Sequence, residues 1–189
     1  MKPRIAPLDP PYAPDVSAAL VKWMPPSSGV EPLGLFRTLV KHSVLSDRMR
    51  PLGSALLGRG LLAARVRELL ILRTCARCGA EYEWGVHATA FSATAGLDPE
   101  NVGASARRSP GQLVDKADPD SLVMRLADEL HDTATVSDAL WAELAARWSE
   151  AELLEMIAVV GFYHLVSFTV NAARVEREPW AAAFPAPSE

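Results

Sequence analysis

Two cysteines, two glutamates and a histidine fall within one short segment, CARCGAEYEWGVH, which runs from Cys75 to His87. Its cysteines are the only ones in the chain. The segment permits three kinds of chemistry, namely thiol redox chemistry, metal binding, and acid–base catalysis by a carboxylate and the histidine. The positions of these residues relative to the expected helix ends favour the third.

The thiol interpretation rests on Cys75 and Cys78, which form a Cys-x-x-Cys pair. Such a pair is reactive when it lies at a helix N-terminus, because the helix dipole there lowers the thiol pKa. Helical spacing predicts a helix over residues 61–77 that ends at Gly79, since glycine readily takes the left-handed conformation that stops a helix. Both thiols then lie at the C-terminal end, so we expect ordinary or raised pKa values. Two packed cysteines are the alternative to a redox pair.

A metal interpretation would combine Cys75, Cys78 and His87, with Glu81 or Glu83 as a fourth ligand. Structural zinc sites usually pair two two-ligand motifs, and the segment contains one such motif. The sequence therefore predicts no metal site, and we expect no cofactor.

The acid–base interpretation rests on a second helix, expected over residues 80–95. Glu83 and His87 are four residues apart and within reach of each other on one stripe of that helix. Trp84 and Phe91 indicate that this stripe faces inward. A buried carboxylate and imidazole perturb each other's pKa values, which suits proton transfer. An exposed ion pair of little consequence is the alternative.

Nearly all of the chain carries helical spacing, and alternating strand patterns are absent, so the fold class expected is all-α. A proline-rich extended arm over residues 1–14 precedes a single domain over residues 15–178, and residues 179–189 form a loose tail. Expected helices, with their predicted N-caps in parentheses, cover residues 16–24 (Asp15), 33–45, 46–60 (Ser46), 61–77, 80–95, 119–132 (Asp118), 138–148 (Ser137) and 150–175 (Ser149), with a turn or short helix at Asp98-Pro99 and a polar loop over 103–117.

Composition narrows the partners and the compartment. The net charge of −4 and the lack of a basic run give no basis for nucleic-acid binding. The apolar run from Met156 to Val170 is shorter than a bilayer span and contains a histidine, so we expect a buried helix and no membrane. The first residues do not resemble a secretory signal, and cysteine is scarce, which together favour the cytoplasm.

The segment RVRELLILRTCARCGAEYEWGVH resembles the carboxymuconolactone decarboxylase superfamily, which also contains the alkylhydroperoxidase D (AhpD)-like enzymes. In the peroxidase branch a helical Glu is followed after twelve residues by a Cys, after three more by a second Cys, and after four more by a His. Counted from Glu68, these positions are Ala80, Glu83 and His87. Both cysteine positions are replaced, and the run AEYEWGVH is similar to the decarboxylase-like branch, which carries Glu at the second one.

The resemblance implies an AhpD-like helical bundle that forms a homo-oligomer, whether a dimer, a trimer or a hexamer. It also implies a pocket of Glu68, Glu83 and His87. His87 would handle the proton at the carbon that loses CO2, Glu83 would orient His87, and Glu68 would tune the pair.

A small carboxylated or lactone substrate also needs a cation to bind its carboxylate. Arg65, Arg73 and Arg77 are the candidates, of which we assign Arg73 to substrate binding together with Tyr82 and Trp84. The alternatives are a thiol peroxidase that uses Cys75 and Cys78, and a non-enzymatic helical oligomer in which the Glu–His pair only satisfies buried polarity.

The remaining histidines are interpreted as structural. His164 is expected to be a satisfied core residue, His131 to lie at a helix end where it interacts with the dipole, and His42 to be solvated. Trp180 and Phe184 in the tail form an apolar patch that we expect to pack on a neighbouring subunit.

Overall fold

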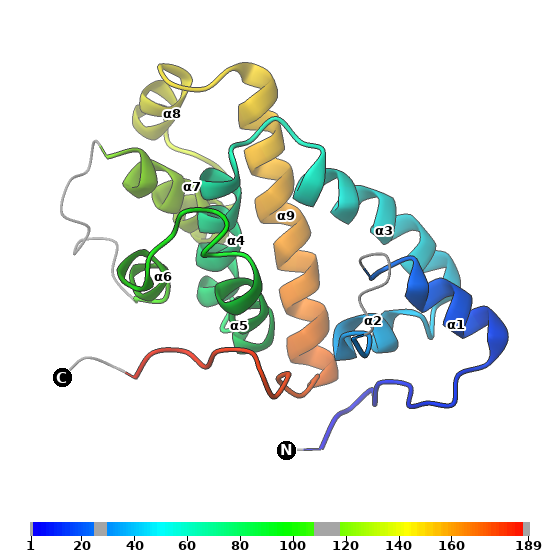
Figure 1. The fold of residues 1–189 in the computed structure, drawn as a ribbon. Helices are drawn as coiled ribbons and strands as arrows, with labels where there is room; N and C mark the ends of the chain where they lie inside the picture. The colour runs from blue at the N-terminus through cyan, green and yellow to red at the C-terminus, as the bar shows by residue number, and fades with distance from the viewer. Residues whose placement is uncertain (1, 25–29, 108–117, 187–189) are drawn as a thin grey trace.

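The structure, a computed structural model, describes residues 2–24, 30–107 and 118–186, and within these ranges it contains nine α-helices and no strand (Figure 1). The all-α prediction is confirmed. The helices are α1 (Pro14–Val21), α2 (Gly34–Leu39), α3 (Ser43–Gly58), α4 (Ala64–Arg77), α5 (Glu81–Ala90), α6 (Pro99–Ser105), α7 (Pro119–Thr133), α8 (Asp138–Ala145) and α9 (Glu150–Ala173).

Helix α4 forms the centre of the core. It packs against α5, α6, α7 and α9, and α9 runs through the molecule with α1–α3 on one side and α4–α8 on the other (Figure 1). Four consecutive α4 residues, Leu69 to Leu72, are fully buried. Because consecutive helical residues point in different directions, α4 must be covered all round.

The helix starts predicted in the last third of the chain are confirmed. Asp118, Ser137 and Ser149 each accept a hydrogen bond from a backbone N–H in the first turn of α7, α8 and α9. These caps depend only on residues close in sequence, which is why spacing identified them.

Two earlier starts were placed wrongly. Helix α1 begins at Pro14, ahead of the predicted cap Asp15, because proline is favoured in the first helical position. The helix expected over residues 33–45 is two helices, and α3 begins at Ser43 with the exposed His42 as its N-cap. Ser46 is buried, and its hydroxyl accepts a hydrogen bond from the Trp23 indole at 2.9 Å.

The two ends of the chain both lie against the helices. In the described part of the N-terminal arm, residues 2–13, no helix forms, as predicted, and the backbone N–H groups of Arg4 and Ile5 donate to the carbonyl of Ala173. The C-terminal segment was expected to be loose, but through residue 186 it is attached along α5 (Figure 1).

The attachment of the C-terminal segment has a physical cause in α5. The Ala182 N–H donates to Thr89 Oγ1 at 3.0 Å, and the Phe184 ring packs on Trp84 of the same chain with 5.1 Å between ring centroids. Gly85 permits this approach, because a Cβ at that position would lie 2.1 Å from the Ala182 carbonyl oxygen. Phe184, one of the two residues of the apolar tail patch, therefore packs within its own chain.

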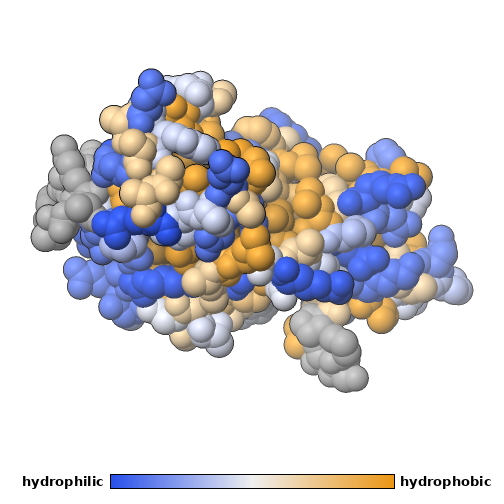
Figure 2. Space-filling model, turned by 90° about the horizontal axis from the view of Figure 1, so that it is seen from above, coloured by the Kyte–Doolittle hydropathy of each residue, from blue (hydrophilic) through white to orange (hydrophobic). Residues whose placement is uncertain are grey.

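The apolar run from Met156 to Val170 was expected to be too short for a membrane span. Helix α9, which contains this run, has 24 residues and is long and apolar enough by length and composition alone, yet half of its most apolar window is buried inside the protein, as in the core helix of a globular protein. Its outer side exposes Leu154, Leu165 and Phe168. On the face shown in Figure 2, apolar surface also lies between the two more polar ends of the molecule. The expected oligomer stays a prediction.

We predict that Gly85→Ala destabilises the protein by about 1–3 kcal/mol, because the new methyl group collides with backbone of the C-terminal segment. Gly161→Ala is the matched control: this glycine is also inside a helix, and a Cβ there meets nothing within 4 Å. The control should gain up to about 1 kcal/mol from helix propensity. Urea unfolding and limited proteolysis near Arg177 measure both effects, and equal stability of the two variants would contradict the prediction.

Candidate active site

The three residues predicted to form a pocket are brought together. Gly79, with φ of +61°, ends the α4 segment and lets α5 fold back beside it. This turn places Glu68 of α4 next to Glu83 and His87 of α5, and α9 adds Tyr163. All four side chains are buried in the core.

His87 is held through both ring nitrogens. Nδ1 lies 2.6 Å from Glu68 Oε2, so the Nδ1–H donates to that carboxylate. Nε2 lies 3.2 Å from the Tyr163 hydroxyl and 3.4 Å from Glu83 Oε1. The Phe91 ring stacks on the imidazole with 4.8 Å between centroids. The shorter contact to the imidazole therefore comes from Glu68, and Glu83, which was expected to orient the ring, lies at its other nitrogen.

Glu83 retains one unused oxygen. Its Oε2 is buried and has no hydrogen-bond partner among the described residues. Buried carboxylate oxygens nearly always have a partner. This atom is therefore a place where a proton or a polar group of a bound molecule would be accepted.

His87 and Glu68 stabilise each other's charged forms. Burial alone would lower the pKa of His87, but its hydrogen bonds to Glu68 and Glu83 outweigh burial and raise the pKa to about 9. Burial likewise tends to raise the pKa of Glu68, and the hydrogen bonds from His87 and Arg67 outweigh it and lower that pKa. At neutral pH an imidazolium thus lies beside a carboxylate.

Two members of the cluster were missed by the sequence analysis. Arg67 Nε donates to Glu68 Oε1 at 3.1 Å, and its side chain is 17% exposed. Burial raises the pKa of Tyr163 well above its ordinary value, so its hydroxyl stays protonated and able to donate. Arg67 is next to Glu68 in sequence and could have been considered. Nothing in the sequence links Tyr163 to His87.

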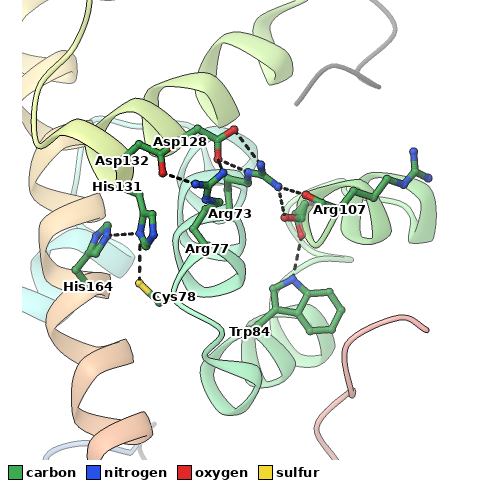
Figure 3. A network of polar contacts seen from close by, with 10 residues as sticks. Arg73, Arg77, Cys78, Trp84, Arg107, Asp128, His131, Asp132 and His164 are labelled. Carbon is green, nitrogen blue, oxygen red and sulfur yellow. Dashed lines mark hydrogen bonds and ion pairs between the residues drawn. The ribbon is translucent and has the colours of Figure 1, made fainter. Parts of the chain in front are cut away.

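Arg73, which we had assigned to substrate binding, has a different position. Its guanidinium is buried and forms a bidentate pair with Asp128 of α7 at 2.6 and 2.9 Å (Figure 3). It also donates to the carbonyls of Ser105 and Arg107. These contacts join α4 to α6 and α7 and occupy the Arg73 guanidinium within the protein.

The other expected substrate-binding residues are also held by the protein itself. Arg65 pairs with Asp120, and Arg77 pairs with Asp132. The Trp84 indole donates to Ser105 Oγ at 3.0 Å (Figure 3). Tyr82 donates to Glu178 at 2.7 Å. These contacts use the polar groups of Trp84 and Tyr82 within the protein, and the assignment of both residues to substrate binding stays a prediction.

The cysteines lie in environments unsuited to thiolates. Cys75 is fully buried, and burial, followed by the charge of Glu83, raises its pKa well above the ordinary value. Burial also raises the pKa of Cys78, which is half-buried. Both directions agree with the prediction from helix position.

The zinc ligands considered from the sequence differ from the residues whose ligand atoms lie together in the structure. Among the described residues, the group of ligand atoms that lies together comprises Cys78, His131 and His164. His164 is half-buried on α9 and not a fully enclosed core residue, and His131 contacts it directly.

Comparison with solved structures places this arrangement in a known fold. An uncharacterized peroxidase-related protein from Silicibacter sp. TM1040 superposes with a TM-score of 0.76 at 14% identity, covering 98% of this chain and 99% of that one. The AhpD core of an uncharacterized peroxidase-related protein from Ralstonia eutropha JMP134 gives 0.75 at 14% identity, covering 93% of each chain. The chain has the AhpD fold.

A third AhpD-fold neighbour is the debrominase Bmp8, solved as a cysteine-to-alanine variant in complex with 2,3,4-tribromopyrrole. It superposes with a TM-score of 0.70 at 15% identity, covering 95% of this chain and 94% of that one. No protein-family model matches the chain, and no curated protein matches it significantly. The superfamily resemblance noted in the sequence is thus supported at the level of the fold, and chemistry must be argued from the site.

Stability should fall as pH rises through the His87 titration. The folded pKa of about 9 exceeds the ordinary 6.5, so this stabilisation is fully present below pH 6.5 and is lost as pH rises through about 9. Glu68→Gln should lower the His87 pKa, weaken this alkaline decline and cost about 3–5 kcal/mol. Urea unfolding between about pH 6 and pH 10 measures this, with exposed Glu100→Gln as control. An unchanged decline in Glu68→Gln would contradict the assignment.

Both thiols should react slowly with iodoacetamide at mildly acidic pH, and Cys75 more slowly than Cys78 because Cys75 is completely buried. Alkylation of the metal-free protein followed by mass spectrometry assigns the rate to each cysteine, and the urea-unfolded chain supplies the reference rate. Rapid labelling of either thiol in the folded chain would reverse our interpretation of the pair.

Proposed function

We propose that this AhpD-fold protein is an acid–base enzyme, of the decarboxylase-like kind, that acts on a small carboxylated or lactone substrate. The observation that carries the proposal is the buried His87 imidazole held between two carboxylates, one of which, Glu83, has an oxygen without a partner. Such paired groups with opposed pKa shifts are typical of acid–base sites.

His87 would act as the proton donor, since its raised pKa keeps it protonated at neutral pH. In a decarboxylation, the bond between the substrate carbon and its carboxylate breaks, CO2 leaves, and the electron pair moves into the adjacent conjugated carbonyl as an enolate. The His87 Nε2–H then delivers a proton to that carbon, and solvent reprotonates the imidazole. Glu68 holds the ring in place throughout.

Two neighbours would assist this step. The neutral Tyr163 hydroxyl lies 3.2 Å from Nε2 and can donate to the developing enolate oxygen. Arg67 is the cation that contacts this cluster, and its partly exposed guanidinium can attract the substrate carboxylate. It takes the role that sequence had given to Arg65, Arg73 or Arg77. Glu83 Oε2 would accept a hydrogen bond from a substrate hydroxyl or would accept a transferred proton.

A thiol peroxidase is the second candidate, and the peroxidase-related descriptions of two structural neighbours favour it. It requires Cys75 or Cys78 as a thiolate, and the burial of both thiols opposes this. A non-enzymatic homo-oligomer, dimeric, trimeric or hexameric, is the third. A cytoplasmic location belongs to the same proposal.

The deciding experiment screens carboxylated lactones for CO2 release. His87→Gln should lower kcat/KM by about 10²–10⁴-fold, the usual contribution of a general acid or base. Glu83→Gln should lower it as well, and exposed His42→Gln serves as the histidine control. Circular dichroism verifies that each variant is folded.

Hydroperoxide consumption with dithiothreitol is measured in parallel for the wild type, Cys75→Ser and Cys78→Ser. Turnover that either cysteine substitution abolishes would replace the acid–base proposal with the peroxidase. No turnover in either assay, together with loss of stability in His87→Gln, would favour the structural oligomer.

A further inference from the structure

Three helices bring a thiol and two imidazoles together outside the proposed active site (Figure 3). Cys78 is the C-cap of α4, His131 lies in the last turn of α7, and His164 lies in the middle of α9. Their ligand atoms all lie within 4.8 Å of one another. The sequence analysis treated these three residues separately, because they are far apart along the chain.

We propose that Cys78, His131 and His164 form a Zn²⁺ site with three protein ligands and a fourth position open to water or a small anionic ligand. Thiolate and imidazole are the ligands that Zn²⁺ prefers, and a site with three protein ligands leaves the coordination open. This inference does not depend on the proposed function.

The spacing of the ligand atoms fits a tetrahedral ion. His131 Nδ1 lies 3.0 Å from His164 Nε2, and Cys78 Sγ lies 3.8 Å from His131 Nδ1. With bonds of about 2.0–2.1 Å to nitrogen and about 2.3 Å to sulfur, a tetrahedral Zn²⁺ separates two nitrogens by about 3.3 Å and nitrogen from sulfur by about 3.6 Å. These two separations are each within a few tenths of an ångström of that geometry, and the third, between Cys78 Sγ and His164 Nε2, is no more than 4.8 Å.

The tautomer of His164 is already set for metal binding. Its Nδ1 lies 2.8 Å from the Val160 carbonyl, which can only accept, so Nδ1 carries the proton. In neutral His164, Nε2 therefore presents a lone pair toward His131 and Cys78. Metal-ligating histidines almost always donate their other ring N–H to a carbonyl or carboxylate in this way.

Contacts between helices hold the backbone that carries these three residues. The Asn171 amide donates to the Cys78 carbonyl at 2.8 Å, which fixes the end of α4 against α9. Helices α4, α7 and α9 also pack on one another. The nearest cation, Arg77, is paired with Asp132 and lies 3.5 Å from Asp128 (Figure 3). Its charge is therefore compensated, and it does not bar a cation from the site.

The test is a Zn²⁺ titration of the metal-stripped full-length protein by calorimetry, repeated with Co²⁺ to detect the thiolate-to-metal absorption band. We expect one ion per chain. Loss of a residue that only supports a metal ligand typically weakens metal binding by about 10–100-fold. Cys78→Ser, His131→Asn and His164→Gln each remove a ligand itself, so each should weaken Zn²⁺ binding by more than this. Cys78→Ser should also remove the absorption band.

Cys75→Ser and His87→Gln are the matched controls, and both should bind Zn²⁺ as tightly as the wild type. Circular dichroism of every variant separates loss of a ligand from loss of the fold. Failure of the wild type to bind one equivalent of Zn²⁺, or binding that is lost in His87→Gln and kept in Cys78→Ser, would overturn the proposal. Zn²⁺ binding is measured without any lactone present, so the two proposals fail independently.

Discussion

The complete burial of the middle of α4, from Glu68 to Cys75, is the constraint on which the rest of the structure depends. A helix segment covered on every side cannot expose its charged side chains to water, so these charges need partners from other helices. Glu68 finds His87 on α5, and Arg73 finds Asp128 on α7. The candidate active site and the polar junction of α4, α6 and α7 are thus two solutions to one requirement. Removing either partner would leave a buried charge uncompensated.

The part of the site that sequence predicted is the part that is local in sequence. Glu83 and His87 share a stripe because they are one helical turn apart, and Glu68 meets them because a single glycine turn joins the two helices. Tyr163 is 76 residues from His87, and Asp128 is 55 residues from Arg73. No periodicity encodes such pairings, because they arise only when α7 and α9 pack on α4.

The fold, too, was predictable where the deciding interactions are local in sequence and not where they are long-range. Caps that involve neighbouring residues, as at Ser149, were predictable because their donors and acceptors lie within one turn. Ser46 was misassigned because Trp23, well away in sequence, uses its hydroxyl. The C-terminal segment was misjudged because its close approach to α5 depends on the missing Cβ of Gly85. A glycine that makes room for a distant segment produces no periodic pattern in the sequence.

Neighbouring residues of α9 connect the two proposed sites. Successive helical residues point about 100° apart, so Tyr163 can face His87 while His164 faces His131. A metal ion bound by Cys78, His131 and His164 would join α4, α7 and α9 at one point. Because Tyr163 is in the same turn as His164, that ion would also limit how far the Tyr163 hydroxyl can move from the imidazole. The position of a proposed proton-transfer group would then depend on a metal held one residue away.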